Sequence, residues 1–120
     1  MKTLPMGIVK AVDRNVSTVK KEFYDACILE VEVGTSSPNG GDWGNGGRTY
    51  FKLTDHASTA WNVRADIPKT GKKHIDNWLE PRNIEIVVGG DAEARVFIQA
   101  LRYAADQLEQ QYELNAKEKK

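Results

Sequence analysis

The residues FYDACILEVEV, at positions 23–33, decide the fold class, because apolar and acidic side chains alternate along them. One face of this segment carries Cys27, Leu29, Val31 and Val33. The other face carries Glu30 and Glu32. Such alternation predicts a half-buried β-strand with one wet face, as is common in antiparallel sheets.

Other segments rich in Val, Ile, Thr or aromatic residues extend this sheet on both sides. We expect strands at 7–13, 48–53, 60–66 and 83–89, with 48–53 and 60–66 forming a hairpin that turns around 55–58. The polar segment 16–22 is interpreted as a turn or loop. The sheet then has about five strands, mainly antiparallel.

A C-terminal amphipathic helix of some twenty residues is predicted after the last strand. Asp91 is a suitable N-cap, and Glu93 suits the positive end of the helix dipole. Apolar residues then recur at helical spacing: Phe97, Ile98, Leu101, Ala104, Ala105, Leu108 and Tyr112. We expect one α+β domain over residues 1–114 and a charged, frayed tail over 115–120.

Composition excludes several classes of function. Seventeen basic and seventeen acidic residues cancel, so a general binder of long nucleic acid or of membranes is not expected. Cys27 is the single cysteine, and we expect it in the core. His56 and His74 show no metal-site spacing, and no catalytic motif is present, so we expect no metal, no cofactor and no enzyme. Residues 1–7 do not resemble a signal peptide, which favours the cytoplasm.

The strongest candidate site is the loop at residues 34–47, GTSSPNGGDWGNGG, which holds six of the ten glycines. Glycines let backbone N–H groups line an anion site, an arginine can clamp a phosphate, and an exposed tryptophan can stack on a base. The residues concerned are Gly41, Asp42, Trp43, Asn45, Arg48 and Thr49. An equally weighted alternative is a structural hairpin connection whose tryptophan folds back onto the sheet.

Two helix arginines extend the candidate ligand-binding set. Arg95 and Arg102 are seven residues apart and therefore lie along one side of the helix. They either line a groove or are solvated flank residues, with Arg102 paired to Asp106. The basic segment 69–74 is a further candidate for phosphate contact, or is simply a solvated loop.

Three stretches together resemble small phage-encoded proteins of the Thoeris anti-defence type: GGDWGNGGRTYFKLTD (40–55), STAWNVR (58–64) and IEIVVGGDAEARVFIQALRYAADQLE (84–109). The resemblance implies a homo-oligomeric sponge that sequesters a cyclic nucleotide or cyclic ADP-ribose immune signal without cleaving it. That activity would antagonise bacterial anti-phage defence. It transfers no individual binding residue to this chain.

Two other classes of function stay open at this point. The chain could be a small protein-interaction or inhibitor module acting on a host protein, with a strand edge or the helix as its contact surface. A small hydrolase using Asp42 has the least support. The helix offers Tyr103 and Tyr112 as an apolar edge for self-association.

Overall fold

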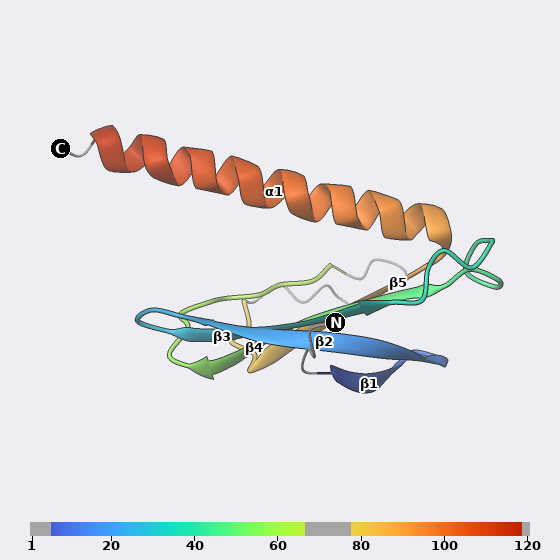
Figure 1. The fold of residues 1–120 in the computed structure, drawn as a ribbon. Coiled ribbons are helices and arrows are strands. Elements are labelled where there is room, and N and C mark those ends of the chain that lie inside the picture. The colour runs from blue at the N-terminus through green and yellow to red at the C-terminus, as the bar shows by residue number, and fades with distance from the viewer. Residues whose placement is uncertain (1–5, 67–77, 119–120) are drawn as a thin grey trace.

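The computed structural model describes residues 6–66 and 78–118. Its elements are β1 (Met6–Ala11), β2 (Arg14–Tyr24), β3 (Ile28–Thr35), β4 (Arg48–Ala57), β5 (Asn83–Gly89) and α1 (Asp91–Glu118). The strands form one antiparallel sheet in the order β1-β2-β3-β4-β5, and α1 runs along one face of it (Figure 1). The predicted α+β class is confirmed.

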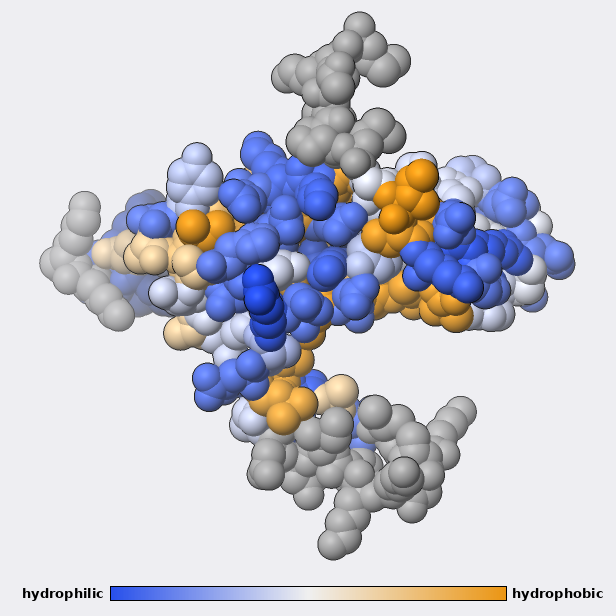
Figure 2. Space-filling view, turned by 90° about the horizontal axis from the view of Figure 1, so that it is seen from below, coloured by the Kyte–Doolittle hydropathy of each residue, from blue (hydrophilic) through white to orange (hydrophobic). Residues whose placement is uncertain are grey.

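The alternation in β3 separates the two faces of the sheet. Val33 pairs with Phe51 of β4, and the Phe51 ring meets the Phe97 ring of α1 edge to face, with centroids 5.9 Å apart. The apolar residues of β3 therefore face the helix, whereas Glu30 and Glu32 lie on the other face. Figure 2 shows that this second face is largely hydrophilic.

The sheet curls at Gly34, where β2 passes close to β3. A Cβ atom at this position would lie 2.1 Å from the backbone oxygen of Ser17, so only glycine permits the approach. The curl brings Ala11 and Val16 against Tyr50, which together form the small buried core. It also carries the β1–β2 turn toward the start of β4.

The expected loop at 16–22 is wrong, because these residues form the middle of β2. The segment pairs with β1 on one side and with β3 on the other. Val16 and Thr18 are buried while the residues beside them are more exposed. Buried and exposed residues alternate in this part of β2, but most of the side chains are polar, so hydrophobicity alone does not reveal the alternation.

The expected strand at 60–66 is also wrong, since among the described residues this segment makes a single isolated bridge, Val63 with Leu79. The free edge of β4 is taken by β5, which pairs with it from Arg48 to Thr54. A strand edge accepts one partner, and the Ile- and Val-rich residues of β5 occupy it.

Helix α1 is longer than expected and continues through residues 115–118. No glycine or proline stops it, and Glu113 and Lys117 stand in the favourable i, i+4 order. Cys27 lies in the β2–β3 turn and is half-buried, not in the core. The basic segment 69–74 lies outside the described residues.

Candidate functional site

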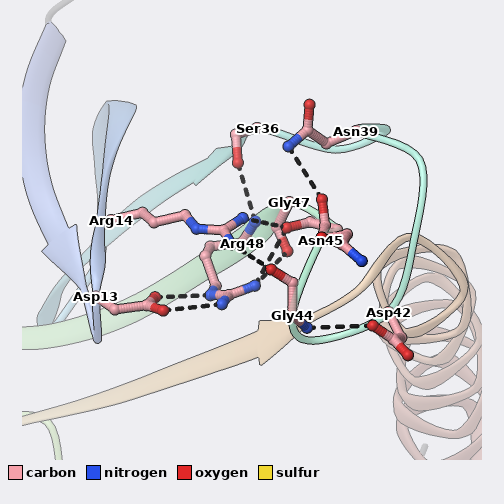
Figure 3. A network of polar contacts seen from close by, with 10 residues as sticks. Asp13, Arg14, Ser36, Asn39, Asp42, Gly44, Asn45, Gly47 and Arg48 are labelled. Atoms are coloured by element: carbon pink, nitrogen blue, oxygen red, sulfur yellow. Dashed lines mark hydrogen bonds and ion pairs between the residues drawn. The ribbon is translucent and has the colours of Figure 1, made fainter.

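Arg48, at the start of β4, is fully buried, and its guanidinium forms hydrogen bonds to a carboxylate and to two backbone carbonyls. It forms a bidentate ion pair with Asp13, in which Nε donates to Oδ1 at 2.9 Å and Nη2 donates to Oδ2 at 3.0 Å. Nη1 donates to the carbonyl oxygens of Gly46 (3.2 Å) and Gly47 (3.3 Å) (Figure 3). The hydrogen bonds from Arg48 hold the pKa of Asp13 below its usual range. Arg48 is therefore not the exposed phosphate clamp that the sequence suggested.

Arg14, which sequence reasoning missed, secures the same loop from the neighbouring turn. Its Nη1 donates to the Gly46 carbonyl at 2.5 Å, and its Nη2 donates to the Gly44 carbonyl at 2.6 Å. The arginine lies thirty residues or more from these glycines in the chain, so no local motif reveals the contact. The curl of the sheet creates it.

The predicted anion-binding concavity exists, and a carboxylate of the protein fills it. Asp91 accepts backbone N–H groups from Asn39 (2.9 Å), Gly40 (2.5 Å), Gly41 (3.1 Å) and Gly47 (3.3 Å). These hydrogen bonds, with that from Asn39 the largest cause, hold the pKa of Asp91 well below its usual range. The predicted N-cap role is wrong, because Asp91 is the first residue of α1 and the carbonyl of Gly90 accepts the first helical hydrogen bond, from Ala94. The Asp91 carboxylate instead ties the loop to the start of α1.

Trp43 folds back onto the sheet, as the structural alternative for the loop describes. Its ring centroid lies 4.0 Å from the Arg48 guanidinium carbon, a cation–π contact. The ring also covers Gly89 so closely that a Cβ there would lie 1.8 Å from a ring carbon. Because 46% of Trp43 is exposed, part of the side chain still faces outward.

Asp42 and Asn45 serve the loop itself. The Asp42 carboxylate accepts the Gly44 amide at 3.2 Å, and its carbonyl accepts the Asn45 amide at 3.1 Å and the Gly46 amide. The Asn45 carbonyl accepts a hydrogen from the Asn39 side chain at 3.2 Å. Asp42 and Asn45 are therefore used within the loop, whereas the buried Ser37 hydroxyl of the same loop has no hydrogen-bond partner among the described residues.

The open site lies beside this loop, in two adjoining hollows between α1 and the sheet that we call the helix–sheet groove. The smaller hollow, of about 210 Å³, is lined by Thr35, Ser37 and Pro38 and, on α1, by Asp91 and Arg95 among others. The apolar hollow, of about 360 Å³, includes Phe51, Phe97 and Leu101. Thr35 and Ile98 line both, so the two hollows are adjacent.

Two of the predicted binding residues, Thr49 and Arg95, line this groove, and Arg102 lines neither hollow. Thr49 lines the apolar hollow, and its hydroxyl shares a 2.8 Å hydrogen bond with Thr35. Arg95 is exposed on the rim, and Arg102 is exposed about 10 Å further along the helix. Neither arginine forms an ion pair with any residue in the described part of the chain, and the suggested pair between Arg102 and Asp106 is not formed.

On the opposite face of the sheet, Glu22, Glu30 and His56 bring together donor atoms of the kind that bind metals. They lie outside the groove.

Comparison of the chain with protein-family models, with curated proteins and with solved structures gave no match. Within residues 6–66 and 78–118, no helix is long and apolar enough to cross a membrane.

Proposed function

We propose that the protein binds and sequesters a cyclic nucleotide or cyclic ADP-ribose immune signal in the cytoplasm of a host cell, without cleaving it. The observation that carries the proposal is Arg95 beside the smaller hollow of the helix–sheet groove, because Arg95 forms no ion pair within residues 6–66 and 78–118. A nucleotide signal has an anionic end and a flat base, and the groove offers a cation beside an aromatic-lined hollow. The resemblance to anti-defence sponges points to the same ligand class.

Each end of the groove has a role in this proposal. Arg95 and Arg102 bind phosphate groups, while Phe51 and Phe97 pack against the base. Asp91 also lines the smaller hollow, and its carboxylate is already hydrogen-bonded by the loop amides. The glycine-rich loop then holds the start of α1 in place, and the ligand binds next to the loop.

The binding test compares two substitutions that each remove one positive charge from α1. Arg95→Ala is expected to weaken binding of cyclic ADP-ribose or its isomers by ~10-fold or more, because a charge-assisted hydrogen bond is lost. Lys117→Ala, near the far end of the helix, is expected to leave affinity unchanged. Isothermal titration calorimetry measures both. Equal affinities for the two variants would remove Arg95 from the site.

We also propose that a second copy of the chain covers the exposed apolar faces of α1 and the sheet. Contiguous exposed apolar side chains mark protein–protein interaction sites, and obligate homodimer interfaces are the more hydrophobic class of interface. Apolar side chains on α1 are more than 60% exposed: Val96, Tyr103, Leu108 and Tyr112.

Leu108→Asp is expected to convert the oligomer to a monomer, because it places a charge in the proposed interface. In an isolated chain the change would be nearly neutral, since Leu108 is 66% exposed. Gln110→Asp, about 200° further round the helix, is the matched control and is expected to keep the oligomer. Light scattering distinguishes the masses, and a wild-type mass of 13.4 kDa would contradict self-association.

A further inference from the structure

Three side chains from adjacent strands converge on the sheet face away from α1. They are Glu22 of β2, Glu30 of β3 and His56 of β4, and their donor atoms all lie within 4.8 Å of one another. His56 Nε2 is 3.1 Å from Glu30 Oε1 and 3.9 Å from Glu22 Oε2. The imidazole nitrogen is thus hydrogen-bonded to one carboxylate and lies close to the other.

The strand register places the two carboxylates directly opposite each other, with Glu22 paired to Glu30. Like charges in this position destabilise a sheet. A cation bound between them removes the repulsion and turns it into attraction. The pair thus has an electrostatic reason to bind a positive ion.

An irregularity in β4 adds the histidine to this pair. Leu29 is paired with Asp55 and Ile28 with Ala57, so His56 is the extra residue of a β-bulge. The Asp55 carboxylate stabilises the bend by accepting the backbone amides of Ala57 and Thr59, each at 3.0 Å. Bulges of this kind redirect a side chain, and here the side chain contacts both glutamates.

The donor set fits one class of ion. One imidazole nitrogen and two carboxylate oxygens suit zinc and similar transition metals, while calcium and magnesium prefer oxygen alone. Bond lengths of ~2.0–2.2 Å in a tetrahedral site put neighbouring donors ~3.3–3.6 Å apart, a range that lies between the observed separations of 3.1 and 3.9 Å. We propose that Glu22, Glu30 and His56 bind one divalent transition-metal ion, with zinc as the representative.

Side-chain exposure leaves this site open on one side. His56 is 33% exposed, Glu30 21% and Glu22 50%, so solvent reaches the position that three protein ligands leave free. The site is separate from the helix–sheet groove, which lies on the other face. Metal binding at this site is therefore independent of nucleotide binding in the groove.

The test uses the full chain without a histidine tag, stripped with a chelator and titrated with zinc chloride in a calorimeter. We expect one saturable site per chain, at least ~10-fold weakened in His56→Ala and in Glu30→Gln. His74→Ala and Cys27→Ser remove the other histidine and the thiol and are expected to retain the site. Circular dichroism checks that each variant is folded.

Absence of saturable zinc binding in the wild-type chain would overturn the proposal, and so would unchanged affinity in His56→Ala. If His56→Ala does not fold, Glu30→Gln decides the question in the same way. Cobalt substitution gives a second reading on the wild type, because a site with this donor set shows the visible absorption of low-coordinate cobalt. A cobalt spectrum identical to that of the free aqueous ion would contradict the site, and His56 would then be a simple ion-pair partner of the two glutamates.

Discussion

Replacing Arg48 by alanine is expected to lower the free energy of unfolding by about 3 kcal/mol or more, measured by urea denaturation. The substitution empties a fully buried site and leaves the Gly46 and Gly47 carbonyls without their donor. Trp43 loses the cation on which it stacks, and Asp13 loses its partner. These losses act together because Arg48 joins the β1–β2 turn to the glycine-rich loop.

Two variants show whether geometry or charge matters at this position. Arg48→Lys keeps the charge but not the planar fork, so we expect it to lose much of the same stability. Arg14→Ala removes an arginine that donates to the same Gly46 carbonyl from a half-buried position, and a smaller loss is expected. Full stability of Arg48→Ala would contradict the structural role. Loss of ligand binding in Arg48→Ala would report on folding rather than on contact with a ligand.

Asp91→Asn is expected to lower the melting temperature by roughly 5 °C or more at pH 7, because four loop amides lose a charged acceptor. The folded-state pKa of Asp91 lies below the ordinary 3.8. Its contribution is therefore complete above about pH 4 and is lost as the pH falls through the depressed folded-state value. The difference between wild type and Asp91→Asn should shrink over that acidic range.

Glu93→Gln is the matched control for Asp91, since it removes the same charge from the same turn of α1. Glu93 accepts none of the loop amides that Asp91 binds. Thermal unfolding followed by circular dichroism at several pH values compares the two variants. A difference between wild type and Asp91→Asn that stays constant down to pH 2 would show that the Asp91 carboxylate is not what stabilises the loop.

The sequence predicted the fold class because its signals are local. The alternation in β3, the Ile- and Val-rich β5 and the apolar spacing of α1 each lie within one segment. The sequence does not reveal strand β2, because the face that carries the buried Val16 also carries the polar residues Thr18 and Lys20. The segment 60–66 was misassigned because the alternation of Trp61 and Val63 does not reveal that β5 already pairs with β4.

The arrangement of the glycine-rich loop (residues 34–47) and its surroundings depends more strongly on contacts between residues distant in the sequence. Glycines and charges near residue 40 indicated an anion-binding loop, but not that Asp91, about fifty residues later, fills it. The pairing of Arg48 with Asp13 requires the sheet to curl at Gly34, which no local pattern encodes. The prediction that Arg95 and Arg102 lie on one side of the helix needed only its periodicity.

The most direct test of signal sequestration is native mass spectrometry of the protein purified from cells that make cyclic nucleotide immune signals. The proposal predicts that the protein carries a bound small molecule and that heating releases this molecule as an intact cyclic nucleotide or cyclic ADP-ribose isomer. A protein that carries no small molecule, and that shows no thermal shift with any such compound, would contradict it. The exposed face of α1 would then favour a module that binds a host protein.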